Sequence, residues 1–270
     1  MALIVLPSVN GSPGVSTTSL GLAQLWPRPA VLVDADPTGG MAIPAGYLRG
    51  AEIPAGRSLV DLSIAHRHGA LADALPGMLL DLPDGRTKLL CGTTTHHQAR
   101  VLDGFWEPLA GALKALERTG QDVIVDAGRL GLEGSPLPLI AAADLCLLVV
   151  RSNLPAVVAA NSWAHTLRDM FDRAGAASSL GLLVIDPDRP YSAKNVSKAL
   201  QIPLIATLPW DPDTAQHLAW GSEAPRWTAL QRLFRRTGGL DRSLLAAVES
   251  IQAHLTATRA TLGVELVERN

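Results

Sequence analysis

Apolar runs of a few residues alternate with longer amphipathic stretches along the whole chain. Continuous apolar runs are typical of strands that are buried on both faces, as in a parallel sheet covered by helices. Apolar residues at helical spacing between these runs predict the covering helices. The strands are expected at residues 2–6, 30–33, 88–91, 123–125, 145–150, 180–185 and 204–208, and the helices at residues 17–26, 58–75, 105–118, 156–173 and 192–200.

The repeated order of strand and helix predicts an α/β fold with a doubly wound, mostly parallel sheet flanked by helices. A further helix is expected at about residues 240–260, followed by a short tail, because Leu244, Val248, Ile251 and Leu255 form an apolar stripe. We expect this stripe to pack on the sheet rather than on a membrane surface, since few basic residues accompany it. With no linker or repeat, residues 1–270 are expected to form a single domain.

The composition supports a globular protein. Hydrophobic residues make up 47% of the chain and charged residues 18%, which argues against disorder, and the net charge of −2 gives no broadly basic surface. No apolar run approaches the ~18 residues of a membrane span, and no basic segment precedes the first apolar run, so we expect a cytoplasmic protein. Cys91 and Cys146 fall in apolar runs and are expected to be buried thiols.

A loop rich in glycine and hydroxyl residues, residues 11–18, joins the first predicted strand to the first helix. Glycines at such a place let backbone N–H groups turn toward an anion, and the following helix adds its positive N-terminus. A hydroxyl in the first helical turn can bind Mg²⁺ in phosphate-binding loops. On its own, a loop of this composition is more often a plain turn.

Acidic and aromatic residues follow three further strands. Asp34 and Asp36 end the second strand, Asp126 ends a middle strand, and Pro209 and Trp210 follow the last strand. Ligands of doubly wound sheets bind at the carboxyl ends of the strands, so we expect these residues and the loop to meet at one edge. Carboxylates in such a place can hold Mg²⁺ or a water molecule.

In this order the motifs resemble those of the ParA/MinD family, the deviant Walker A P-loop ATPases of the SIMIBI class. That family has a loop like K-G-G-x-G-K-T-T after its first strand, then D-x-D-P, D-x-P/A-G, A-D-x-x-L-L-V-V and I-P-x-D segments. The corresponding segments here are residues 11–18, 34–37, 126–128, 143–150 and 208–211. The resemblance covers residues 2 to about 220 and implies a P-loop NTPase-like fold.

The resemblance also implies a site for ATP and Mg²⁺. The residues that would line the phosphates are Gly11, Gly14, Ser16, Thr17 and Thr18. Thr17, Asp36 and Asp126 would hold the metal, and the two aspartates would also arrange the attacking water. Pro209 and Trp210 would lie near the base. Members of the family often dimerise face to face and work with a protein partner in partitioning, positioning or secretion systems, which implies a homodimer and such a partner here.

The loop nevertheless contains no lysine. Aligned without a gap, the family's loop lysine falls at Ser16 and its signature lysine at Gly11, and no lysine precedes Lys88. The loop lysine places positive charge on phosphate oxygens during phosphoryl transfer. Its loss implies a degenerate P-loop, and so a pseudo-ATPase or a very slow ATPase. Alternatively, Arg129 or Arg151, each near the end of a strand, supplies the missing charge, and Arg129 is then catalytic.

Three functions therefore stay open. The first is a regulatory or scaffolding partner in a partitioning or positioning system, which binds nucleotide weakly or not at all. The second is an active Mg-ATPase of the same family. The third is a nonspecific DNA-binding module that uses Arg232, Arg235 and Arg236, although this basic segment with its apolar residues also fits a surface helix.

Overall fold

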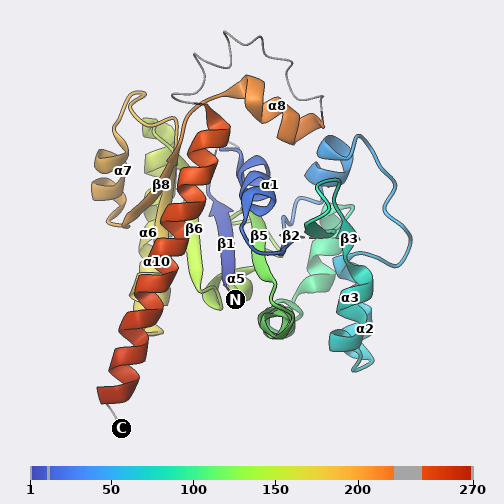
Figure 1. The fold of residues 1–270 in the computed structure, drawn as a ribbon. Coiled ribbons are helices and arrows are strands. Elements are labelled where there is room, and N and C mark those ends of the chain that lie inside the picture. The colour runs from blue at the N-terminus through green and yellow to red at the C-terminus, as the bar shows by residue number, and fades with distance from the viewer. Residues whose placement is uncertain (1, 11–12, 222–238, 269–270) are drawn as a thin grey trace.

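The computed structural model describes residues 2–10, 13–221 and 239–268 of the chain. Within these residues, eight strands form one sheet in the order β3-β4-β2-β5-β1-β6-β7-β8 (Figure 1). All neighbouring strands are parallel except β3 and β4, so the predicted mostly parallel sheet is confirmed. The strands are β1 (Leu3–Ser8), β2 (Ala30–Asp34), β3 (Leu80–Asp81), β4 (Thr87–Leu90), β5 (Asp122–Arg129), β6 (Leu145–Arg151), β7 (Leu180–Ile185) and β8 (Leu204–Leu208).

Helices cover both faces of the sheet. One face packs against α1 and α10, and the other packs against α2 to α7, so that two apolar clusters enclose the strands (Figure 1). The α-helices are α1 (Val15–Leu25), α2 (Leu59–Arg67), α3 (Leu71–Met78), α4 (Trp106–Ala115), α5 (Leu137–Ala141), α6 (Leu154–Arg173), α7 (Ala193–Leu200), α8 (Pro212–Trp220) and α10 (Leu240–Glu268). The short helical turns are the π-helical η1 (Ala42–Tyr47) and the 3₁₀ turns η2 (His96–Leu102), η3 (Leu116–Thr119) and η4 (Ala177–Ser179).

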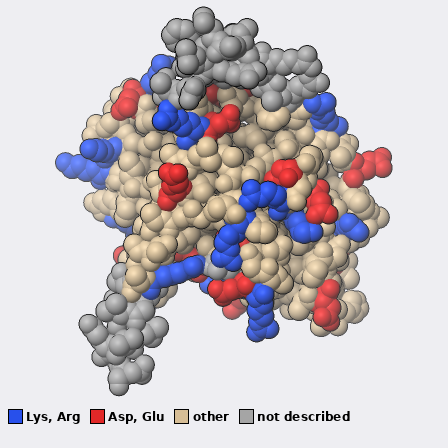
Figure 2. Space-filling view, viewed as in Figure 1, with Lys and Arg blue, Asp and Glu red and all other residues tan. Residues whose placement is uncertain are grey.

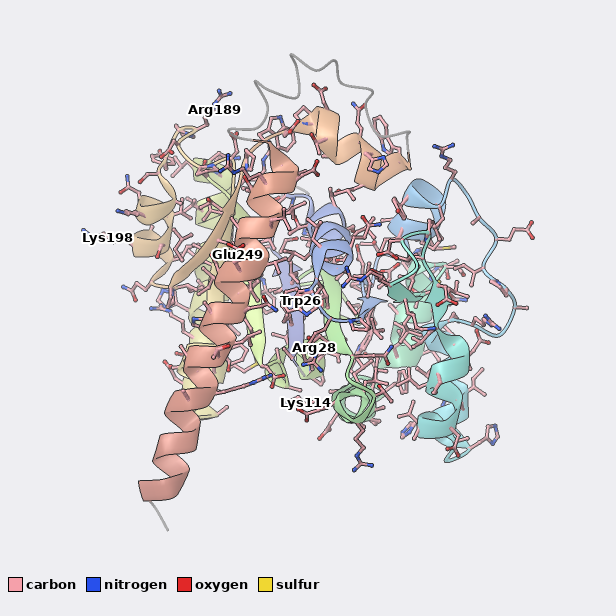
Figure 3. The ribbon with its side chains drawn as sticks, viewed as in Figure 1. Trp26, Arg28, Lys114, Arg189, Lys198 and Glu249 are labelled. Atoms are coloured by element: carbon pink, nitrogen blue, oxygen red, sulfur yellow. The ribbon has the colours of Figure 1, made fainter. Side chains whose placement is uncertain are left out.

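Helix α1 is fixed at its C-terminal end to the amino ends of the strands. The Trp26 indole N–H donates to the buried carboxylate of Asp122 at 2.8 Å, and the same carboxylate accepts from the backbone N–H of Ala2 at 2.7 Å. In Figure 3, Trp26 and Arg28 accordingly lie in the central part of the view below α1, whereas α8 is at the top. Because this end of α1 is anchored at the amino ends of the strands, its N-terminus points to the carboxyl edge of the sheet.

The structure departs from the expected elements in several places, and one of them is the short helix α5, which the expected helices do not include. The single helix expected at residues 58–75 is two helices, because α2 ends at Arg67 and Gly69 (φ +73°) turns the chain before α3 begins. The strand β3 is an addition to the expected elements, since its two residues are too few to carry a pattern. The expected turn after the last strand continues into helix α8, which Asp211 caps and in which Pro212 occupies the first turn.

The C-terminal helix is confirmed. In α10, Leu244, Val248, Ile251 and Leu255 are buried against the face of the sheet that α1 also covers. On the face seen in Figure 2, basic and acidic residues are interspersed rather than gathered in one broad patch. Among the described residues, no helix combines the length and apolar character that crossing a bilayer requires.

Candidate functional site

The loop between β1 and α1 has the backbone geometry of an anion-binding turn. Gly14 lies in the left-handed region (φ +91°), and a Cβ at this position would meet no atom within 4 Å. Its carbonyl accepts the N–H of Thr18 at 2.8 Å, which starts the helix. No side chain among the described residues caps α1 at Gly14. The first N–H groups of an eleven-residue helix therefore face the space above the sheet.

Two adjoining hollows open at this helix start. The first, which we call the polar cavity, has a volume of about 540 Å³. Its lining includes Ser8, Gly14, Ser16, Thr17, Asp36, Thr38, Asp126, Gly128 and Arg129. The second, the apolar cavity, has a volume of about 270 Å³. Its lining includes Gly14, Thr17, Thr18, Ile185, Leu208, Pro209, Trp210, Gln216, Trp220 and Leu240.

The sheet register brings the acidic residues together. Asp34 and Asp126 are direct neighbours across β2 and β5, and the chain continues from Asp34 into Asp36 over the carboxyl edge. The Asp36 carboxylate lies so close to Gly128 that a Cβ on Gly128 would collide with it. Gly128 also has a positive φ of 59°, so glycine is required at this position on two counts.

Two of these carboxyl groups titrate abnormally. Burial, followed by the charges of Asp126 and Asp36, raises the pKa of Asp34 to about 8. Burial, together with the charge of Asp36, raises the pKa of Asp126 to about 6, although hydrogen bonds from Ser16 and from the Gly128 N–H at 2.9 Å favour its charged form. Burial without a paired metal cation thus favours the protonated forms of Asp34 and Asp126.

The two candidate arginines lie in different surroundings. Arg129 lines the polar cavity and donates its Nε–H to the carbonyl oxygen of Val9 at 3.0 Å. Arg151 does not line that cavity, and its guanidinium stacks on the ring of Trp210 at 3.9 Å. Of the two, only Arg129 is placed to supply charge beside Asp36 and Asp126.

The structure thus brings together most of the site residues predicted from the sequence. Those in the polar cavity are Gly14, Ser16, Thr17, Asp36, Asp126 and Arg129. Those in the apolar cavity are Thr18, Pro209 and Trp210, with Gly14 and Thr17 shared between the two cavities. Gly11, Arg232, Arg235 and Arg236 lie outside the described residues.

Sequence reasoning missed several lining residues, among them Thr38, Gln216 and Trp220. Thr38 follows the second strand, and its N–H donates to the Asp36 carboxylate at 2.9 Å. Gln216 and Trp220 come from α8, which is absent from the expected helices. The pair Asp211-Pro212 was the available signal, since an N-cap aspartate followed by proline is a common helix start.

The residues present fit a magnesium-bound phosphate chain in part. Thr17, Asp36 and Asp126 supply one hydroxyl and two carboxylates, and Mg²⁺ in such sites takes few protein ligands and completes its shell with phosphate and water. The described residues contain no group of three or more His, Cys, Asp or Glu side chains that could hold a metal alone. The open turn at Gly14 and the start of α1, which no described side chain caps, suit phosphate oxygens.

No protein-family model matches this sequence, and no curated protein matches it by sequence. Solved structures do match it. The cell division ATPase MinD of Pyrococcus furiosus is 18% identical with a TM-score of 0.67, covering 94% of this chain and 99% of that chain. MinD of Pyrococcus horikoshii, solved with Mg-ADP, is 18% identical with a TM-score of 0.64, covering 93% and 96%. A ParA family ATPase of Chlorobium tepidum is 17% identical with a TM-score of 0.66, covering 92% and 99%. The chain therefore has the fold of the MinD and ParA ATPases.

Proposed function

We propose that this chain is a ParA/MinD-like partitioning or positioning protein with a degenerate nucleotide site. It acts as a regulatory or scaffolding partner and binds nucleotide weakly or not at all. The observation that carries the proposal is the polar cavity, where Asp36 and Asp126 lie beside the start of α1 and no lysine of the loop accompanies them. The fold supports a ParA/MinD-like role, and the acidic residues of the cavity support weak nucleotide binding.

The residues of the two cavities can each be given a role in binding a magnesium-bound phosphate chain and a base. The turn at Gly14 and the first N–H groups of α1 would bind the phosphate oxygens, and Thr17 would offer its hydroxyl to Mg²⁺. Asp36 and Asp126 would bind the metal or orient a water molecule. Bound Mg²⁺ would neutralise phosphate charge. The apolar cavity beside Trp210 would take a flat ring by stacking.

The balance of charge opposes a triphosphate. Asp36 and Asp126 line the cavity, and buried Asp34 lies beside Asp126 across the sheet. Arg129 is the one basic residue among the described lining residues, and Ser16 stands where the family has its lysine. Removing one preorganised donor from such a site typically raises the barrier by roughly 2.7–4 kcal/mol, about 10²–10³ in rate. Hydrolysis by this chain is therefore expected to be very slow or absent.

An active Mg-ATPase is the second candidate, and the position of Arg129 is the observation that favours it. This arginine lines the polar cavity, and an arginine can pair with phosphate through two parallel hydrogen bonds. The carbonyl of Val9 already accepts its Nε–H, so the terminal nitrogens would have to make the contact. Arg151 is less suited to this role, because it stacks on Trp210 at the apolar cavity.

Calorimetric titration with ATP and Mg²⁺ tests the proposal, with ADP and GTP as comparisons. We expect no binding, or only millimolar binding, by the natural chain. Ser16→Lys restores the charge at the family's lysine position and should tighten ATP binding by about tenfold or more, equivalent to about 1.4 kcal/mol. Ser16→Met is the matched control, because it adds similar length without charge and should bring no gain.

Micromolar ATP binding and turnover by the natural chain would overturn the degenerate-site proposal in favour of the ATPase. Arg129→Ala would then abolish turnover, and Arg151→Ala would leave it largely intact. A DNA-binding module using Arg232, Arg235 and Arg236 stays a third proposal. Retention of DNA that weakens steeply with salt would support it, and no retention at low salt would remove it.

A further inference from the structure

The short π-helix η1 and helix α8 meet above the two cavities, although about 170 residues separate them in the chain. In Figure 1 the blue segment that follows β2 reaches the end of α8 at the top of the molecule. Between them lies a third hollow, lined by Ser16 and Thr17, by residues of η1, and by Leu218, Ala219 and Trp220 of α8. The contact therefore borders the start of α1.

The two backbones touch directly, and glycine makes this possible. A Cβ on Gly46 would collide with the carbonyl oxygen of Ala219, and a Cβ on Gly221 would collide with the carbonyl oxygen of Tyr47. Arg49 adds a hydrogen bond from its Nε–H to the carbonyl oxygen of Gly221 at 2.5 Å. We call this set of contacts the latch.

The segment held by the latch is strained. Met41 (φ +46°) and Arg49 (φ +55°) bracket η1, and both are non-glycine residues in the left-handed region. Single π-helical turns are rare and concentrate at functional sites. Strained backbone of this kind persists only where its surroundings hold it, so release from α8 would let the segment relax.

Each side of the latch continues into one of the cavities. The segment that leads into η1 carries Asp36 and Thr38, which line the polar cavity. On the other side, Ala219 and Trp220 line the apolar cavity, and Trp220 is 64% exposed. The Asp36 loop is thus connected to α8 through η1 and the latch, along a route that does not pass through the sheet.

We propose that the latch couples the two cavities, so that a magnesium–phosphate ligand at Asp36 and Thr38 releases η1 from α8 and opens the apolar cavity at Trp220. The part played by the ligand rests on the proposed function in the case where the degenerate site still binds phosphate weakly, whereas the mechanical link does not. Such coupling is reciprocal, so a ligand that holds α8 in place would also oppose binding in the polar cavity.

Amide hydrogen exchange followed by mass spectrometry tests the mechanical link without ligand. Gly46→Ala places a methyl group against Ala219 and should speed exchange about fivefold or more in both residues 36–49 and residues 212–221. Gly111→Ala is the matched control, since a Cβ there meets no atom within 4 Å. Arg49→Ala removes one hydrogen bond of the latch and should change the same two segments more weakly. Faster exchange in only one segment, or in neither, would overturn the link.

The ligand half is tested by adding inorganic pyrophosphate with Mg²⁺ to the natural chain. We expect protection of residues 36–39 together with faster exchange in residues 212–221, and loss of the second effect in Gly46→Ala. Protection of residues 36–39 with α8 unchanged or protected would overturn release of the latch and leave the phosphate site standing. If exchange changes in neither segment, the proposal that the ligand controls the latch is overturned. That result would agree with a site that binds no phosphate. The exchange rates of the variants without ligand still decide the mechanical link.

Discussion

Replacing Asp34 by asparagine should make the stability of this protein less dependent on pH. Asp34 is 5% exposed, and its carboxylate lies beside Gly92 and accepts the N–H of Asp36 at 3.3 Å. Its pKa is raised from 3.8 to about 8, mainly by burial and then by the charges of Asp126 and Asp36. Asparagine has the same shape, keeps an acceptor oxygen and does not titrate.

The sign and size of this pH dependence of stability follow from proton linkage. Between pH 4 and pH 8 the unfolded chain has lost this proton while the folded chain still binds it, so the free energy of unfolding falls as the pH rises. The loss is about 1.4 kcal/mol per pH unit for one proton, which amounts to at most about 4 kcal/mol at pH 7. The Asp34→Asn variant would escape this loss, because its amide binds no proton in either state. The stability difference between Asp34→Asn and the natural chain should therefore increase with pH.

Urea unfolding followed by tryptophan fluorescence at pH 5, 6, 7 and 8 measures this difference. A stability difference that is the same at every pH would reflect the cost of burying the amide. The change of this difference with pH is therefore the quantity that tests the reasoning. Asp81→Asn, which removes an exposed carboxylate paired with Lys88 at the far edge of the sheet, controls for a lost surface charge. If the difference between Asp34→Asn and the natural chain does not grow from pH 5 to pH 8, the reasoning is refuted.

Three further changes test the packing around the site. Gly128→Ala, with its positive φ and its contact with Asp36, should lower stability by about 1–3 kcal/mol in urea unfolding, and a change near zero would contradict that conformation. Ile251→Ala, at a fully buried position of α10, should cost about 2–5 kcal/mol, and a loss below about 1 kcal/mol would mean that α10 does not pack on the sheet. Burial, then the Asp34 charge, raises the pKa of Cys91 to about 12, so a thiol reagent at pH 8 should label Cys91 only after unfolding. Rapid labelling of the native protein would instead show that the end of β4 is open to solvent.

The sequence by itself determined the layers of the fold. Each of the runs predicted as strands is a strand. Continuous apolar residues such as those of β6 alternate between the two faces of a strand, so they are all buried only when helices cover both faces of the sheet. The stripe of Leu244, Val248, Ile251 and Leu255 determined that α10 packs on the sheet. The order of the strand-end motifs resembles that of the ParA/MinD family, and this resemblance implied the ParA/MinD-like fold that the structure has.

The sequence also located most of the site, because residues at the ends of adjacent parallel strands must lie together. Asp36, Asp126, Thr17 and Trp210 could be assigned to one edge in this way. Helix α8 was missed, because its few apolar residues form no extended stripe and its Asp211-Pro212 start was interpreted as a turn. The break at Gly69 between α2 and α3 was also missed, because residues 58–75 together have the apolar spacing of a single helix.

Only the tertiary structure decided how the site is charged and enclosed. Arg129 and Arg151 are the last residues of β5 and β6, yet one lines the polar cavity and the other stacks on Trp210. The difference arises because each side chain contacts neighbours from other elements. The raised pKa of Asp34 depends on burial and on Asp126 across the sheet. The contact of Gly46 with α8 joins segments far apart in the chain. Local pattern determines which face of an element is buried, whereas these properties arise from distances between elements, which no local pattern encodes.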